Sequence, residues 1–223
     1  MNTAITRPDR ELLKAIYRQS KETAAASTGS LADALNVSPG TVTAHVKKLV
    51  ERGFVVHEPY KGVELTPSGR QVAIAAIRRH RIVERFLSDM LGYAWNEADR
   101  LAGEFEHNLP QEVEDRLFVA LDRPETCPHG FPIPEPDVTE MPDMPSLYAL
   151  EPGQTAIVAV PGSTEPDVVA FLDTLGLRPG VEIEVKEKHP FEGPLVLRVG
   201  TKERTVGEKV ARQIFVSSIS TPQ

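Results

Sequence analysis

The chain has 223 residues, a formal net charge of −7 and one cysteine, which indicates one large or two small domains without an internal disulfide framework. The charge is unevenly distributed, because residues 1–81 carry 13 Lys/Arg and 7 Asp/Glu, whereas residues 82–223 carry 12 and 25. No apolar run approaches the roughly 18 residues of a membrane span, and the N-terminus has no apolar signal core. We therefore expect a cytoplasmic protein with no membrane segment and a basic N-terminal part that can face nucleic acid.

Two capped helices separated by a short break form the most specific pattern in the N-terminal third. After a first helix expected at residues 7–26, Ser30 is expected to cap a short second helix. Ser38 is expected to cap the next helix, with Pro39 at its first position, where a missing backbone N–H is harmless. Three apolar residues of this helix recur at helical spacing and are expected to face inward: Val42, Val46 and Leu49.

A hairpin is expected directly after this helix pair. Residues 54–57 and 63–66 alternate between apolar and polar side chains, and a turn at 59–62 joins them. A helix pair followed by a hairpin is typical of a winged helix-turn-helix, whose second helix enters the major groove of DNA. The alternative, a helical hairpin that contacts only protein, accounts less well for a capped pattern this specific.

The rest of the chain changes character near residue 147. Helices are expected at residues 67–90, 96–108 and 110–121, and a proline-dense segment that cannot form regular structure follows. Beyond it, one helix near 167–175 interrupts a series of short strands expected at 155–160, 181–186, 195–199 and 214–217. The pattern predicts an α+β multidomain fold with a winged helix-turn-helix, a helical middle part and a small C-terminal β-barrel.

Imidazole and carboxylate groups recur in the middle helices. His80 and Glu84 are four residues apart and share a helix face, while Glu106 and His107 are adjacent near the end of the next helix. If these helices pack antiparallel, the four side chains come close together. They would form a set of imidazole and carboxylate ligands without thiolate, which favours a manganese or ferrous ion. The alternative is that each is an ordinary surface residue, but four such groups downstream of a helix-turn-helix, three of them in the acidic part of the chain, favour metal binding.

Cys127 and His129 form a Cys-x-His pair inside the proline-dense segment. Such a pair can bind metal, but a structural zinc site needs four ligands and the chain has no second cysteine. We therefore interpret the pair as part of a rigid turn between prolines.

At several separate places the sequence resembles the diphtheria-toxin-repressor family of metal-dependent regulators, in its manganese-regulator branch. The matching text is ELLKAIY, the winged motif through LTPSGR, RRHRIVERFL, EHNLPQEVEDRL and CPHGFPIP, while LGLRPGVEIEV and GPLVLRVG resemble an FeoA-like (SH3-like) domain. The resemblance implies a homodimer that binds a palindromic operator in double-stranded DNA when loaded with metal, usually as a repressor of metal-uptake genes. It also implies a DNA-binding domain at 1–70, a helical dimerisation and metal-binding domain at 71–140, a linker at 141–146 and the FeoA-like domain at 147–223.

The resemblance implies a primary metal site made of Glu11, Glu106 and His107. The sequence departs from the family at Gly103, which stands where a cysteine or glutamate ligand is usual and offers only a main-chain carbonyl. Glu104 is one residue further and about 100° around the helix, so it is a doubtful substitute, and water is the other candidate.

An ancillary site is implied as well, formed by His80 and Glu84 with Asp99, where many members have histidine. Glu165 matches a carboxylate ligand that comes from the C-terminal domain, whereas Val168 replaces an amide ligand and cannot coordinate metal. Plain surface charge is the alternative for Asp99 and Glu165.

The DNA contacts implied by the family lie at the start of the second helix of the motif. They are Ser38, Pro39, Gly40, Thr41 and Thr43. Lys47, Lys48 and Arg52 are expected to add sequence-independent attraction, and Lys61 in the wing is expected to contact phosphate. Ala44 replaces an adenine-contacting glutamine of the family, so the operator sequence is expected to differ.

The donor set also predicts a metal preference. Glu11 replaces a thioether and Gly103 a thiolate, so the remaining oxygen-rich set favours Mn(II), then Fe(II), with Zn(II) or Co(II) binding in vitro. Two other classes stay open: a helix-turn-helix regulator that senses an organic ligand or redox state, and a metalloenzyme with Glu106 as general base. The enzyme is disfavoured, because the chain lacks the i, i+4 histidine pair of a zinc protease and any nucleophile constellation.

Overall fold

The structure is a computed structural model that describes residues 5–20, 25–58, 61–141, 144–160 and 166–221. The chain divides into two compact units. The first unit comprises Met1–Val83, Leu101–Arg123 and Ile133–Met141, and the second comprises Glu84–Arg100, Pro124–Pro132 and Pro142–Gln223. These units interleave along the chain, so the predicted domain limits at 70, 140 and 147 stay predictions.

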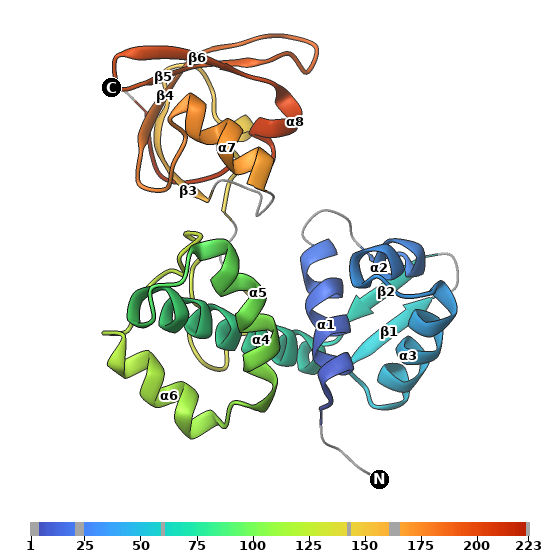
Figure 1. Cartoon of the computed structure of the whole chain (residues 1–223). Coiled ribbons are helices and arrows are strands. Elements are labelled where there is room, and N and C mark those ends of the chain that lie inside the picture. The colour runs from blue at the N-terminus through green and yellow to red at the C-terminus, as the bar shows by residue number, and fades with distance from the viewer. Residues whose placement is uncertain (1–4, 21–24, 59–60, 142–143, 161–165, 222–223) are drawn as a thin grey trace. The chain divides into compact units, whose positions relative to one another are not determined.

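The first unit contains the winged helix-turn-helix (Figure 1). Its elements are α1 (Arg7–Gln19), α2 (Thr28–Leu35), α3 (Pro39–Glu51), β1 (Val55–Glu58) and β2 (Gly62–Leu65). Helix α1 begins with a capping box, in which the Thr6 side chain accepts from the Asp9 N–H and the Asp9 carboxylate accepts from the Thr6 N–H. Ser38 caps α3 and Pro39 occupies its first turn, as predicted.

Two expectations in this region are wrong. Helix α2 is capped by Ser27, whose hydroxyl accepts from the N–H of Ser30 at 3.0 Å, so Ser30 lies inside the helix. Helix α1 ends at Gln19 and does not extend to residue 26, because Ala26 pairs with Val63 in a β-bridge. This close approach also explains Gly62, whose φ is +106° and whose Cβ, if present, would lie 2.7 Å from the Ala26 carbonyl oxygen.

One apolar core joins all five elements of the motif. Leu12, Leu13 and Ile16 of α1 are at most 1% exposed and pack with apolar residues of the other elements. Those residues include Leu31, Val42, Val46, Leu49, Val55 and Val63. The outer face of α3 is left in solvent as a result.

Three helices follow the wing. Helix α4 (Pro67–Arg85) continues into a π-helical turn (Phe86–Met90), and α5 (Trp95–Phe105) continues into a 3₁₀ turn (Glu106–Asn108) before α6 (Gln111–Ala120). These bounds agree with the expected helices at 67–90, 96–108 and 110–121. Within the first unit, Arg79 Nε donates to the Glu114 carboxylate at 2.7 Å and so ties α6 to α4.

The second unit contains a five-stranded antiparallel sheet in the order β6-β5-β4-β3-β7. Its elements are a 3₁₀ turn (Leu147–Ala149), β3 (Thr155–Val160), α7 (Pro166–Leu175), β4 (Glu182–Lys188), β5 (Leu195–Val199), β6 (Lys202–Val206), α8 (Glu208–Ala211) and β7 (Phe215–Ser220). Helix α7 lies against the sheet (Figure 1). Its Leu172 is fully buried in the apolar core of this unit. In the part of the chain that the structure describes, the strand pairs leave the sheet open between β6 and β7. Strand β6 and helix α8 were not expected from the sequence.

The α+β fold class is therefore confirmed. Among the described residues, no helix is both long enough and apolar enough to cross a membrane.

Candidate metal centre

Glu11, Glu106 and His107 come together in the first unit, as the resemblance implied. Each offers a ligand atom, and these atoms all lie within 4.8 Å of one another. His107 Nε2 is 3.6 Å from Glu11 Oε1 and 3.9 Å from Glu106 Oε1. Helix α1 carries Glu11, whereas the 3₁₀ turn after α5 supplies Glu106 and His107. Arg10 donates to the His107 carbonyl at 3.1 Å and holds α1 against that turn.

Two of the three side chains are buried, and this burial disfavours the charged form of the imidazole. The side chains of Glu106 and His107 are 4% and 5% exposed, and that of Glu11 is 36% exposed. Burial is the main cause that lowers the pKa of His107, although the Glu106 carboxylate opposes it. Among the residues that the structure describes, neither ring nitrogen of His107 has a hydrogen-bond partner. A buried imidazole without hydrogen-bond partners, beside two carboxylates, fits a divalent cation.

Two side chains of the protein itself, Lys14 and His80, already contact Glu106. Lys14 Nζ donates to Glu106 Oε1 at 2.7 Å, and His80 Nδ1 lies 2.9 Å from Glu106 Oε2. Burial alone would raise the pKa of Glu106, but His80 and Lys14 together lower it to about 2. Glu106 is therefore an anion at neutral pH and is available as a ligand.

Gly103 lies one turn before Glu106 on α5 and contributes no side chain. A Cβ placed on it would meet no heavy atom within 4 Å among the neighbouring residues that the structure describes, so the position has room for one. Glu104 is exposed and belongs to none of the metal-type clusters found among the described residues. The structure therefore does not bring Glu104 together with Glu11, Glu106 and His107.

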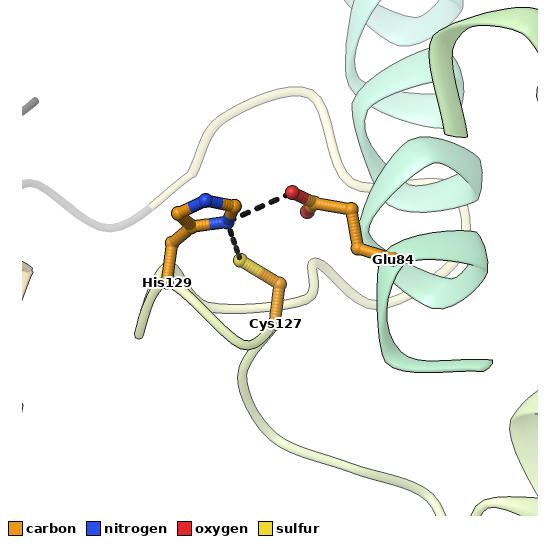
Figure 2. Close-up of side chains that lie close together, drawn as sticks. All are labelled: Glu84, Cys127 and His129. Atoms are coloured by element: carbon orange, nitrogen blue, oxygen red, sulfur yellow. Dashed lines mark hydrogen bonds and ion pairs between the residues drawn. The ribbon is translucent and has the colours of Figure 1, made fainter. Parts of the chain in front are cut away.

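A second buried cluster was not expected from the sequence. Figure 2 shows Cys127 and His129 on the proline-dense loop facing Glu84 of α4. His129 Nδ1 is 2.8 Å from Glu84 Oε1 and 4.0 Å from Cys127 Sγ. All three residues belong to the second unit and are at most 6% exposed.

The loop builds this cluster by a tight turn. The Cys127 N–H donates to the Phe131 carbonyl at 2.9 Å, and the Gly130 N–H donates to the Cys127 carbonyl at 2.9 Å. The interpretation as a rigid turn is thus correct for the backbone, but it misses that the turn presents two ligand atoms to Glu84. The Cys-x-His spacing was the available signal, and the third partner lies 43 residues earlier on another element.

The remaining residues of the predicted ancillary site are placed as follows. His80 is one turn before Glu84 on α4 and pairs with Glu106. Within the second unit, a carboxylate oxygen of Asp99 lies within 4.8 Å of a ligand atom of Glu84. Glu165 lies outside the described residues. Val168 is partly buried and packs against the core of the sheet, in line with its inability to bind metal.

The predicted DNA-contacting residues share the solvent face at and after the start of α3. Those that are exposed are Ser38, Pro39, Gly40, Thr41, Thr43, Lys47 and Lys48. Ala44 is exposed beside them. Lys61 of the wing is exposed and pairs with Glu58 at 2.6 Å.

A buried carboxylate links α1 to α3, and sequence reasoning did not identify it. Asp9 is 3% exposed, and its oxygens lie 2.8 Å from His45 Nε2 and 2.7 Å from Arg52 Nη1. Burial alone would raise the pKa of Asp9, but the Thr6 N–H, Arg52 and His45 hold it well below its usual range. Asp9 precedes Glu11 by two residues, so α1 contacts both the metal-type cluster and the exposed helix.

Comparisons with known proteins agree with this arrangement. Three family models match consecutive parts of the chain: the N-terminal DNA-binding domain of iron dependent repressors at residues 5–63, their metal-binding and dimerisation domain at 66–135, and the FeoA domain at 146–218. The iron-dependent repressor IdeR of Mycobacterium leprae is 30% identical over 220 residues, which cover 93% of this chain and 95% of that protein. IdeR of Mycobacterium tuberculosis is 29% identical over 221 residues, with the same coverage.

Solved structures are similar over almost the whole length. A manganese-dependent transcriptional repressor in complex with manganese has a TM-score of 0.81 and 30% identity, covering 94% of this chain and 99% of that chain. ScaR with bound Cd²⁺ has a TM-score of 0.80 and 27% identity, covering 94% and 98%. Nothing in these similarities supports a sensor of organic ligands or of redox state. The chain belongs to the iron-dependent (diphtheria toxin) repressor family of metal-dependent, dimeric, DNA-binding transcriptional repressors, which are not enzymes.

Proposed function

We propose that this repressor binds its operator when a divalent cation, Mn(II) in the first place, is held by Glu11, Glu106 and His107. The observation that carries the proposal is a cluster that joins α1 to the end of α5. It leaves both ring nitrogens of the buried His107 side chain without hydrogen-bond partners in the described part of the chain. When bound, the cation neutralises the two carboxylates and links the two elements.

The link to DNA runs through α1. Glu11 and Asp9 are two residues apart on this helix, and Asp9 contacts His45 and Arg52, which lie in and directly after α3. Fixing α1 at Glu11 therefore restrains α3 through short, buried contacts. In a dimer, this favours one spacing of the two recognition helices, and a coupling of about 1–3 kcal/mol between metal and operator is typical of such systems.

The face of α3 that meets DNA is suited to close approach. Its first turn carries small side chains and hydroxyl groups from Ser38 to Thr43, which fit thymine methyl groups and phosphates. Lys47, Lys48 and Lys61 add positive charge that does not depend on base sequence. We propose that Ala44 gives this repressor an operator different from that of relatives with glutamine there.

We propose a second metal position at Glu84, Cys127 and His129. The carboxylate of α4 and the thiol and imidazole of the loop are buried within 4.8 Å of one another, and they have the chemistry of a ligand set rather than of a structural turn. Asp99, next to Glu84, and Glu165, outside the described residues, remain predicted additional ligands. His80, with its ring nitrogen on Glu106, orients a ligand of the first site, so its predicted place in the ancillary ligand set stays an expectation.

The two sites have different metal preferences. The Glu11 site offers two carboxylates and one imidazole, which suits Mn(II) and then Fe(II), whereas the thiol of Cys127 suits Zn(II) or Co(II). A solved structure of ScaR contains Cd²⁺ and another contains Zn²⁺, so relatives accept several divalent ions. Mn(II) as the activating ion is our proposal for this chain.

An operator-binding titration tests the assignment. The full-length protein, freed of metal by chelation, is titrated anaerobically with Mn(II) and with Fe(II) against a duplex operator. We expect binding at a lower free concentration of Mn(II), and we expect Glu11→Gln to fold normally but to lose the response. Glu203→Gln removes an exposed carboxylate on β6 and serves as the matched control. A Glu11→Gln protein that responds to metal like wild type, or a lower threshold for Fe(II), contradicts the proposal.

A further inference from the structure

Lys14 stands out because it is a charged side chain buried inside the metal-type cluster. The residue is 4% exposed, on α1, three residues after Glu11. Its Nζ is 2.7 Å from Glu106 Oε1 and 2.9 Å from Glu11 Oε1. A lysine is almost never this buried unless its charge is compensated, and here the two compensating carboxylates are the proposed metal ligands.

The ammonium group and a metal ion require the same oxygen atoms. The Oε2 atom of Glu106 lies beside His80 Nδ1. The other oxygen, Oε1, accepts from Lys14 and is the one that lies 3.9 Å from His107 Nε2. Glu11 presents Oε1 both to Lys14 and to His107 Nε2. A cation that uses these oxygens meets a positive charge at hydrogen-bond distance from both, and two cations on one oxygen repel each other.

The local charge also limits how many ions the cluster can hold. Glu11 and Glu106 contribute two negative charges, and Lys14 cancels one of them. A single divalent ion then brings the local charge to about +1, whereas a second ion would bring it to about +3 beside the buried side chains of Glu106 and Lys14.

We propose that Lys14 is an internal competitor of the metal ion, which raises the metal concentration needed for activation and limits the Glu11 site to one ion. The inference rests on the proposed function of that site. Without metal, Lys14 holds Glu11 of α1 beside Glu106 and keeps the ligands together. Metal binding then replaces the singly charged ammonium group of Lys14 by a doubly charged ion between the two carboxylates. The metal binds less tightly than it otherwise would, because the contacts of Lys14 are lost.

Calorimetric titration of the metal-free, full-length protein with Mn(II) tests this role. Lys14→Met and Lys14→Gln both remove the charge. The amide of Lys14→Gln can still donate to a carboxylate, so this variant serves as the test if Lys14→Met fails to fold without metal. Arg18→Met removes an exposed charge from the same helix and is the control. We expect at least about tenfold tighter Mn(II) binding in both Lys14 variants, equal to about 1.4 kcal/mol, and a lower melting temperature of the metal-free form.

The outcomes separate the two proposals. Mn(II) affinity that is unchanged or weaker in both Lys14 variants overturns the competitor role, because Lys14 would then be neutral or would assist binding. Wild-type affinity in Glu11→Gln shows instead that the metal does not use this site, and both proposals fail. Tighter binding in the Lys14 variants, together with loss of binding in Glu11→Gln, supports both.

Discussion

Replacing Asp9 by Asn tests whether α1 positions the recognition helix. The substitution keeps the shape of the side chain and one acceptor oxygen for the Thr6 N–H, but it removes the charge that faces His45 and Arg52. Hydrogen bonds to charged groups contribute about 1.5–3 kcal/mol each. Because the side chains of His45 and Arg52 are 21% and 26% exposed, water replaces part of what is lost. We therefore expect a total loss of about 2 kcal/mol, less than the sum of two such bonds.

Two measurements follow from this estimate. For a chain of this size, 2 kcal/mol corresponds to a decrease of about 4–8 °C in Tm. If α3 loses its fixed position, operator affinity at saturating Mn(II) falls about tenfold, which equals about 1.4 kcal/mol. Affinity for Mn(II) itself should stay within about twofold, a change of about 0.4 kcal/mol, because Asp9 is outside the proposed ligand set.

Asp33→Asn is the control, since it removes an exposed carboxylate from α2 of the same unit. Fluorescence anisotropy with a labelled operator measures DNA affinity, and calorimetry measures Tm and metal binding. If Asp9→Asn binds the operator as tightly as wild type although its Tm is lowered, Asp9 has a purely structural role and the link from α1 to α3 is refuted.

Four further outcomes are expected. Gly103→Glu places a carboxylate in open space at the missing ligand position, so the affinity for Mn(II) should rise. Gly103→Ala controls for the gain in helix propensity of about 1 kcal/mol. Equal Mn(II) affinity in both variants would exclude a ligand role for the new carboxylate. Cys127→Ser should weaken Zn(II) binding more than Mn(II) binding, as measured by competition with a chelator, whereas equal losses would point to a packing defect. Lys61→Ala should weaken binding to specific and non-specific DNA equally and lower the slope of log affinity against log salt by about one; a loss confined to one operator would contradict a phosphate contact. In metal-free protein the pKa of Glu106 is lowered from 4.5 to about 2, so its contribution to stability is complete above pH 4.5 and is lost as the pH falls toward 2. The free energy of unfolding, measured with urea, should therefore depend less on pH in this range in Glu106→Gln than in wild type. Identical pH dependence in the two proteins would refute the contribution.

Much of the fold could be predicted because it depends on local patterns. The bounds of β3 and β5 are those expected from the apolar runs, and Ser38 with Pro39 marks the start of α3. Strand β6 (Lys202–Val206) was missed because it is an edge strand with mostly exposed, charged residues. The cap of α2 was misplaced because Ser27 and Ser30 are three residues apart and either can cap a helix; the bridge at Ala26 ends the preceding segment and leaves Ser27 as the cap.

The candidate site was predictable only where one element carries the signal. Glu106 and His107 are adjacent in sequence, and their role could be inferred together with Glu11 from the family resemblance. The contact between Lys14 and Glu106 joins residues 92 positions apart. Lys14 also lies among the apolar residues of an amphipathic helix, where a lysine is usually expected to reach for solvent. Glu11, three residues earlier on the helix, indicates an ion pair with Lys14, but nothing in the sequence indicates that Lys14 is buried or that it reaches Glu106.

The distribution of soft and hard ligands between the two clusters affects which of several metal ions can activate this repressor. Sequence comparison suggested that soft ligands had been removed, since Glu11 and Gly103 replace sulfur groups. In the structure, sulfur is instead present at Cys127, beside His129 and Glu84. Affinity for nitrogen and sulfur ligands rises from manganese to zinc, so an ion such as Zn(II) is expected to fill the Cys127 cluster first. Under our proposals, the Glu11 cluster, which has two carboxylate ligands and is opposed by the charge of Lys14, then responds to a harder ion at a higher concentration. Activation by Mn(II) is therefore compatible with tighter total binding of Zn(II), provided that the signal to α3 passes through Glu11 and not through Cys127.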